Sequence, residues 1–485
     1  MNKKVFSNFL YQASYQLLLI LMPIITIPVV SRALGPSGIG VYQYVYSIVS
    51  YFVLVAGLGL QNYGVREIAI VRSDRQKLSK KFWELTLFNI SFSIIIFIIY
   101  ILLIPFFRYS SLFFIQGATV LSNLFDISWF FGGLEDFRKV TIRNFIVRIS
   151  TFILILLFIR NKNDLILYFI IMSISTLLGQ MSLWISLKNF VDLSKVTMKE
   201  IWSHFKPSLS FFIARIAFQF YYNVSLTLLG VFSTMKDVGF FSNGVMLVSV
   251  AGSVINSLNT VMIPRMSNMY GNDDEEGMIH ILSKTVHLQL YFTIAIVFGI
   301  ITINKQMIMW FYGPEFAQLE HMVPLIAPIL VFQTLQTSIA SQYLIPKKEM
   351  FAYNQTVLIG ALCCTIINIL LIPKIGVYGA ITGYGIGYII LCILRSRVLL
   401  KSTVFRFNWR LIIGSIISGL VMLIVTTLLT NNLSSSITTT AIQCLTGMIL
   451  YLGFSTIIKI NPLSDFVFLN KLVRKVKSVI NKINK

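Results

Sequence analysis

The chain has 485 residues, of which 56% are hydrophobic and 12% are charged, and its formal net charge is +22 at pH 7. This composition excludes a water-soluble globular protein, because so much apolar surface requires a bilayer as its solvent. It also argues against nucleic-acid binding, which needs basic residues interleaved with aromatics on a soluble domain.

Fourteen charge-poor apolar segments follow one another along the chain. Each is about 20 residues long, the length at which a helix crosses about 30 Å of hydrocarbon. The sequence therefore predicts an all-α polytopic membrane protein. In chain order, the predicted transmembrane helices are 9–30, 42–60, 83–106, 112–133, 140–159, 165–187, 209–232, 238–263, 286–303, 322–344, 351–372, 377–394, 411–429 and 437–458.

Positive charge lies almost entirely on one side of these segments. If the N-terminus is inside, most of the 40 lysines and arginines fall in inner segments, with the largest groups at 66–81, 395–410 and 459–485. The positive-inside rule then places both termini in the cytoplasm, where the basic belt faces anionic lipid.

The sequence offers little for metal or catalytic chemistry. The four cysteines lie inside predicted spans without a paired-thiol spacing, and the four histidines are scattered. The acidic run 273–276 is typical of a solvated loop. We expect no metal site, no cofactor and no enzymatic activity.

Weak internal repetition runs through the chain. Gly40 opens the second span and Gly239 the eighth, and the same offset relates Arg66 to Arg265. A second echo relates 128–137 to 341–350. These repeats predict two six-helix lobes, related by an axis along the membrane normal and facing a central cavity. The predicted domains are a first lobe 1–187, a basic cytoplasmic linker 188–206, a second lobe 207–400, helices 13 and 14 over 401–458, and a basic cytoplasmic tail 459–485.

Three charged residues lie well inside predicted spans, where a charge costs about 2.5–3.5 kcal/mol. Asp126 and Arg148 are equally far from Phe137, so an antiparallel hairpin brings them to one depth. We favour an intramembrane ion pair between them, with a functional role as the alternative. Arg215 has no acidic residue in its own helix and remains a candidate anion site.

Polar side chains form stripes on five predicted helices. Lipid cannot satisfy them, so they face one another or water. Interhelical hydrogen bonding is one explanation; we favour a hydrated cavity, because the stripes come from both halves. Amides, hydroxyls and tyrosines suit sugars, and guanidinium suits phosphate. The candidate substrate-binding residues on these stripes are Gln12, Gln16, Tyr42, Tyr46, Arg215, Gln219, Asn223, Asn256 and Gln336.

Several motifs together resemble a known family. Residues 31–42 (SRALGPSGIGVY) and 57–69 (GLGLQNYGVREIA) are similar to the N-terminal signature of bacterial polysaccharide flippases of the Wzx type. Residues 129–137 (WFFGGLEDF) resemble their fourth-helix motif, although Gly132 stands where such proteins usually have Gln. The match continues more diffusely at 238–241, 263–267 and 368–380.

This resemblance implies a two-lobed, alternating-access transporter of the bacterial plasma membrane, in a superfamily with multidrug exporters and peptidoglycan-precursor flippases. The implied cargo is an undecaprenyl-diphosphate-linked oligosaccharide for capsule, exopolysaccharide or O-antigen synthesis. Besides this cargo and membrane lipid, polysaccharide polymerase machinery is an open partner. The sequence does not distinguish a proton from a sodium ion as the coupling ion.

Roles for the basic residues follow from this hypothesis. Arg215, with Arg66 and Arg265 at the inner rim, is expected to attract the diphosphate. Arg32 is either a loop anchor or a ligand contact.

Two rival functions remain: a multidrug or cation exporter, which needs acidic cavity residues, and a membrane glycosyltransferase or polymerase. The second rival needs a large catalytic loop or domain, and the longest outer loop, 304–321, is short.

Overall fold

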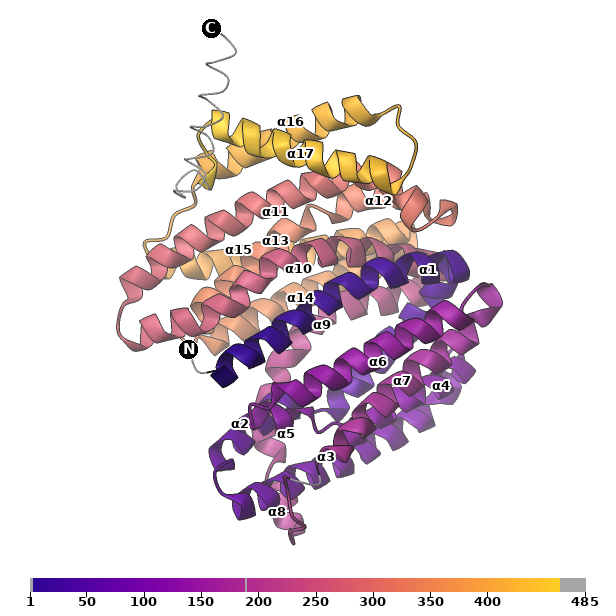
Figure 1. Ribbon diagram of the computed structural model, residues 1–485, viewed down its shortest axis with the longest axis vertical. Coiled ribbons are helices and arrows are strands. Elements are labelled where there is room, and N and C mark those ends of the chain that lie inside the picture. Colours follow the sequence, from indigo (N-terminus) through magenta and orange to yellow (C-terminus); the bar gives the residue numbers. More distant parts are fainter. Residues whose placement is uncertain (1–2, 188–189, 463–485) are drawn as a thin grey trace. The chain divides into compact units, whose positions relative to one another are not determined.

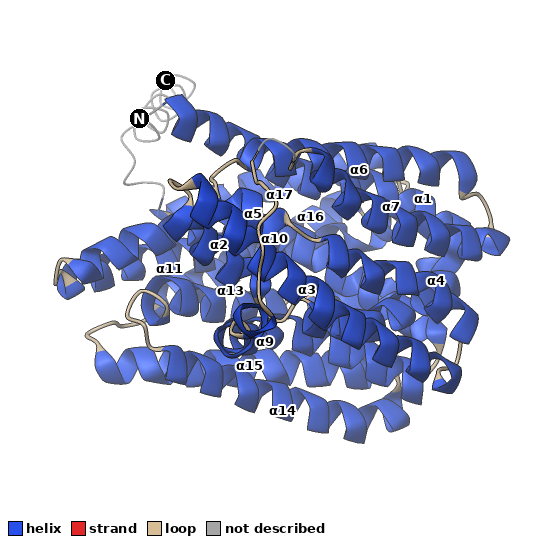
Figure 2. Ribbon diagram, turned by 90° about the horizontal axis from the view of Figure 1, so that it is seen from below, coloured by secondary structure: helices blue, strands red, loops and turns tan. Residues whose placement is uncertain are grey.

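The computed structural model describes residues 3–187 and 190–462, and it describes their side chains except at 3–21, 137, 210–211 and 213–219. Over these ranges the chain is helical and contains no strand (Figures 1 and 2). The helices are α1 Lys3–Ala56, α2 Leu60–Val71, α3 Arg75–Leu103, α4 Ser110–Leu121, α5 Ser128–Gly133, α6 Phe137–Phe158, α7 Leu165–Ile185, α8 Met198–Trp202, α9 Phe205–Phe232, α10 Met235–Gly271, α11 Glu275–Phe311, α12 Leu319–Ile326, α13 Ile329–Ile339, α14 Met350–Ile375, α15 Val377–Ser402, α16 Trp409–Thr430 and α17 Ile437–Ile457.

The predicted all-α membrane architecture is confirmed. Eleven helices in the described ranges are long and apolar enough to cross a membrane, and α1 covers the first two predicted spans. Two predicted spans are not continuous helices. The fourth is split into α4, a 3₁₀ turn at Ser122–Phe125 and α5, and the tenth into α12, α13 and a π-helical segment at Ala340–Leu344.

Gly35 marks the turn between the first two spans. Its backbone lies at φ 66° and ψ 176°, which is non-helical and strained for any residue with a side chain. A Cβ at this position would also crowd the Glu315 carboxylate. Pro36 follows directly, so the Leu-Gly-Pro sequence ends one span and begins the next.

Gly40 and Gly239, which open the second and eighth spans, bring two helix backbones into contact. A Cβ on Gly40 would overlap the carbonyl oxygen of Met235, and a Cβ on Gly239 would overlap that of Pro36. Each glycine therefore faces the residue four positions before the other glycine. This reciprocal contact relates equivalent positions of the internal repeat.

Helices of the chain gather into two compact units. The first comprises 1–243, 311–316 and 357–387, and the second comprises 244–310, 317–356 and 388–485. Within the first unit, α1 packs against α4, α6 and α9, and α2 packs against α3 and α5. Within the second, α16 and α17 lie side by side (Figure 1). These units do not coincide with the predicted lobes, so that domain division stays a prediction.

The predicted linker is folded onto α3 rather than extended. Both Asp192 carboxylate oxygens accept hydrogen bonds from Arg75, at 2.8 and 2.9 Å. Lys80 donates to Glu200, and this bond, with those from Thr197, lowers the pKa of Glu200 to about 2. Acidic residues thus anchor the segment that the sequence marks as basic. Residues 188–189 of the linker and 463–485 of the predicted tail lie outside the described residues.

Candidate functional site

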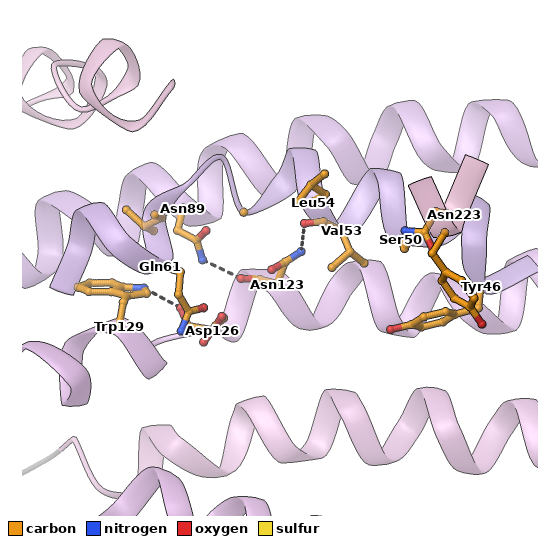
Figure 3. Close-up of a pocket in the computed structure, with 13 residues that line it drawn as sticks. Tyr46, Ser50, Val53, Leu54, Gln61, Asn89, Asn123, Asp126, Trp129 and Asn223 are labelled. Carbon is orange, nitrogen blue, oxygen red and sulfur yellow. Dashed lines mark hydrogen bonds between the residues drawn. The ribbon is translucent and has the colours of Figure 1, made fainter. Parts of the chain in front are cut away.

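A polar pocket of about 350 Å³ lies within the first unit (Figure 3). Its walls come from α1, α2, α3, the 3₁₀ turn at Ser122–Phe125, α5 and α9. Amides, hydroxyls, aromatic rings and one carboxylate share the lining with a few aliphatic side chains. The lining residues are Tyr46, Ser50, Val53, Leu54, Gly57, Leu60, Gln61, Asn89, Asn123, Asp126, Trp129, Tyr222 and Asn223.

Asp126 reaches the pocket because the fourth span breaks there. Its backbone is extended between the 3₁₀ turn and α5. One carboxylate oxygen, Oδ1, accepts the Ser128 N–H at 2.9 Å, and the Trp129 indole N–H donates to the Asp126 carbonyl at 2.9 Å. A carboxylate that accepts a backbone N–H two residues on favours a turn over a continuing helix. The local sequence thus holds the charge at the pocket wall.

Two asparagines continue the wall from Asp126. The Asn89 amide nitrogen donates to the backbone carbonyl of Asn123 at 2.7 Å, and the Asn123 amide nitrogen donates to that of Val53 at 2.9 Å. A backbone carbonyl can only accept, so both nitrogens must face the wall. This fixes the orientation of both amides. Gln61 lies beside Asp126 and donates to the Ser128 hydroxyl at 3.3 Å (Figure 3).

Tyr46, Ser50 and Asn223 form the other end of the pocket, with Val53 and Leu54 between the two ends (Figure 3). Asn223 donates from its amide nitrogen to the Ser50 hydroxyl at 2.9 Å, and Ser50 donates to the Ser47 carbonyl at 2.7 Å. Because the Ser50 hydrogen is already used, the Asn223 amide must be the donor.

The structure brings three of the predicted residues, Asp126, Tyr46 and Asn223, together in this pocket. Tyr42 is buried beside it, with its ring 4.8 Å from that of Tyr168 and 5.9 Å from that of Tyr46. The side chains of four further predictions lie outside the described part of the chain, although their backbones are helical in α1 and α9: Gln12, Gln16, Arg215 and Gln219.

The remaining predicted arginines are exposed and do not line the pocket. Arg66 on α2 forms an ion pair with Glu67 at 3.1 Å, and Arg265 lies on α10. Arg32 packs close to Gly313, a geometry that suits the loop-anchor alternative.

The predicted ion pair between Asp126 and Arg148 is not formed. The ion pairs of the described residues do not include it, and Arg148 is exposed on α6. The prediction assumed a continuous hairpin of two helices. Because the fourth span breaks at Asp126, the carboxylate turns toward the N-terminus of α5 instead.

In the second unit, Gln336 accepts hydrogen bonds from Arg395, a buried residue that the charge pattern of the sequence placed at the cytoplasmic surface. Arg395 is fully buried, since α15 continues to Ser402. Its Nη1 donates to the Gln336 side-chain oxygen at 2.5 Å and to the Gln336 carbonyl at 3.2 Å. Its guanidinium also lies 4.6 Å from the centroid of the Tyr353 ring. The hydropathy pattern predicted that the span ends at residue 394, so it did not predict that Arg395 is buried.

A second cluster of amides fills the interior of the same unit. Gln342 donates to Asn259 at 2.8 Å and to Gln289 at 3.3 Å, while Gln289 donates to Asn259 at 3.1 Å. Thr285 and Ser338 donate to the oxygens of Gln342 and Gln289. Asn256, a predicted substrate-binding residue, lies next to this cluster, and its side-chain oxygen accepts a hydrogen bond from the Asn259 amide at 3.4 Å. We call these five residues, Asn259, Thr285, Gln289, Ser338 and Gln342, the amide network.

Comparisons with known proteins agree with this architecture. The model of a family described as "Polysaccharide biosynthesis protein" matches residues 5–270. An Escherichia coli K12 protein named "Putative O-antigen transporter" is 22% identical over 290 residues, which are 58% of this chain and 70% of that protein. A Haloferax volcanii protein named "Probable low-salt glycan biosynthesis flippase Agl15" is 20% identical over 239 residues, 49% of this chain and 50% of that protein.

Two solved structures share the fold. Lipid II flippase MurJ, in an inward closed conformation, matches with a TM-score of 0.75 at 18% identity, over 93% of this chain and 98% of MurJ. An inward-facing multidrug resistance transporter of the MATE family, in the MOP superfamily, matches with a TM-score of 0.59 at 17% identity. This match covers 79% of this chain and 96% of the transporter.

Proposed function

This chain belongs to the polysaccharide biosynthesis protein family, and from this premise we propose that it is a flippase for lipid-linked oligosaccharides. The proposed cargo is an oligosaccharide on undecaprenyl diphosphate, moved from the cytoplasmic to the outer leaflet of a bacterial plasma membrane. Both termini lie in the cytoplasm in this scheme, and the two halves expose the glycan to each side in turn. Capsule, exopolysaccharide or O-antigen synthesis is the proposed context.

The polar pocket of the first unit is the observation that carries this proposal. Open polar groups among membrane-spanning helices cost free energy, so they are expected where a polar ligand passes. The amides, hydroxyls and aromatic rings of the lining are the groups that bind sugars. A lipid tail needs no such groups and can stay in the bilayer.

The diphosphate requires positive charge, which the described residues of the pocket lining do not supply. Arg215 on α9 keeps this role as a proposal from the sequence, because a guanidinium forms forked hydrogen bonds with phosphate. Arg66 and Arg265, both exposed, are the further proposed contacts.

A cation or multidrug exporter is the second candidate function. It is favoured by one observation, the Asp126 carboxylate at the pocket wall. An exporter predicts that deletion of the gene sensitises cells to cationic drugs and leaves the lipid-linked glycan on the outer leaflet.

The leaflet location of the lipid-linked glycan in a deletion strain tests the proposal. The strain is complemented with the wild-type chain, with Arg215→Ala, or with Arg160→Ala as a matched control, since Arg160 is exposed and outside the pocket. We expect glycan trapped inside without the protein, and export restored by the wild type and Arg160→Ala only. Glycan on the outer leaflet of the deletion strain would contradict the flippase function. Full export by Arg215→Ala at normal protein level would remove Arg215 from the site.

A further inference from the structure

The open polar atoms of the pocket are mainly oxygens. Asn89, Asn123 and Asn223 each use an amide N–H for a bond to the protein, and none of their side-chain oxygens forms a hydrogen bond. The partners of these nitrogens can only accept, so the amides cannot be flipped to present nitrogen to the pocket instead. The side-chain oxygens are therefore the available groups.

Two of these asparagines are almost completely buried, and their oxygens are open only toward the pocket. Asn89 is 4% exposed and Asn223 is 7% exposed. These oxygens are not among the described buried side-chain atoms that lack a hydrogen-bond partner, so they are open to a ligand or water in the pocket. Both side chains line the pocket (Figure 3).

Asp126 adds a negative charge to this set of acceptors. Its Oδ1 is bonded to the Ser128 N–H, and its second oxygen forms no hydrogen bond within the protein. Gln61 beside it donates to Ser128, which leaves the Gln61 oxygen open as well. Among the described residues of the pocket lining, Asp126 is the single charged residue.

Aromatic rings occupy both ends of the pocket. Trp129 lies at the Asp126 end, and Tyr46 and Tyr222 lie at the Asn223 end. Aromatic faces attract cations, and amphipathic rings pack on apolar surfaces while their polar tips remain wet. Among the described lining residues, the hydroxyls of Tyr46 and Tyr222 are the O–H groups that form no hydrogen bond within the protein.

We propose that this pocket is the sugar subsite and that it selects sugars by their hydrogen-bond donors, with an ammonium group of an amino sugar bound at Asp126. Hydroxyl and ammonium groups match the open oxygens, whereas a uronate carboxylate or the diphosphate would meet Asp126 as a like charge. The inference rests on the proposed function, and it assigns the sugar rather than the diphosphate to Asp126.

Binding to the purified full-length protein tests the selectivity. Three soluble trisaccharides serve as probes: a glucosamine trisaccharide with free amines, its fully N-acetylated counterpart, and a galacturonate trisaccharide. Asp126→Asn is the test variant, because an asparagine oxygen can still accept the Ser128 N–H and so preserve the turn. Asp136→Asn is the matched control, since Asp136 pairs with Lys139 outside the pocket. Thermal unfolding verifies that both variants fold.

We expect the wild type and Asp136→Asn to bind the amine trisaccharide about tenfold more tightly than the galacturonate, as a charge-assisted hydrogen bond predicts. Asp126→Asn should lose most of this difference and bind the N-acetylated probe nearly unchanged. Equal or tighter binding of the galacturonate by the wild type, an unchanged ratio in Asp126→Asn, or no binding of any probe would overturn the subsite.

The leaflet assay separates this inference from the function. Normal glycan export with no amine preference overturns the subsite alone. Amine preference together with glycan already outside in the deletion strain overturns the flippase function and leaves the binding chemistry standing.

Discussion

The pocket of the first unit and the amide network of the second contain similar residues in different states. The repeat that aligns Ser128 with Ser341 also aligns Trp129 with Gln342 and Asp126 with Ile339. In the second unit, Gln342 joins its amide to three neighbours and closes the interior. In the first, Trp129 bonds to the wall and Asp126 keeps an oxygen open. Amide content is therefore no guide to a binding site; the two regions differ because the side-chain oxygens of the amide network are bonded, whereas those of the pocket are open.

The largest expected effect is on stability, from the substitution Gln342→Leu in the amide network. The substitution removes the hydrogen bond that the Gln342 side-chain oxygen accepts from Thr285. It also removes the two that the Gln342 nitrogen donates to Asn259 and Gln289. We expect a loss of about 3 kcal/mol in the free energy of unfolding, since each unsatisfied buried group costs about 1–3 kcal/mol. Denaturation of the purified protein in detergent measures it. A loss below about 0.5 kcal/mol would mean that the network does not hold the second unit together.

The matching substitution in the pocket, Asn89→Leu, should separate stability from function. The Asn123 carbonyl loses the Asn89 bond but keeps the Asp126 N–H at 3.2 Å. We therefore expect a loss of about 1 kcal/mol in stability but a clear fall in glycan export, because Leu removes an open oxygen. Export is measured by the leaflet assay at equal protein level. Unchanged export would contradict a role for Asn89 in the pocket.

A third buried cluster lies at the linker end of the first unit and can be titrated. His204 contacts the Tyr63 hydroxyl at 2.8 Å and Glu84 at 3.2 Å, with Lys81 bonded to the same carboxylate. Burial lowers the pKa of His204, and the Glu84 hydrogen bond opposes this only in part. The unfolded chain therefore binds a proton more readily than the folded chain does.

Stability should consequently fall as the pH drops below about 6.5, the ordinary pKa of histidine. Melting temperatures at pH 7.5 and 5.5 check this, with His280→Gln as the control because His280 is exposed. His204→Gln should flatten the dependence. If the wild type and His204→Gln respond to pH alike, other groups cause the change.

The smallest expected effect is that of Asp126→Asn on stability. Because the new amide oxygen can still accept the Ser128 N–H, we expect the free energy of unfolding to change by less than about 0.5 kcal/mol. The same variant should alter ligand preference. A large loss of stability would mean that Asp126 stabilises the fold, as the amide network does. The pocket and the amide network would then not differ in the way described above.

The sequence predicted the spans well because hydrophobic length is a local property. It failed where tertiary contacts decide. Arg395 was placed at a cytoplasmic surface because the apolar run ends at residue 394, whereas α15 continues and buries it against Gln336. The amide orientations of the pocket were likewise out of reach, since they depend on carbonyls from other helices.

Asp126 was identified as an intramembrane charge but given the wrong partner. A local signal was present, because Asp followed two residues later by Ser at the start of a short apolar run is typical of a new helix beginning. That signal predicts the break between α4 and α5, and with it the turn of the carboxylate toward the pocket.

The reciprocal contact of Gly40 with Met235 and of Gly239 with Pro36 has an evolutionary consequence. It looks the same from either repeat, as an isologous interface does between two copies of one chain. Elsewhere the two repeats carry different residues at equivalent positions, such as Asp126 and Ile339. At this contact neither glycine can gain a side chain, because its Cβ would overlap a backbone carbonyl of the other repeat. The pair is therefore the part of the internal symmetry that substitution is least able to change.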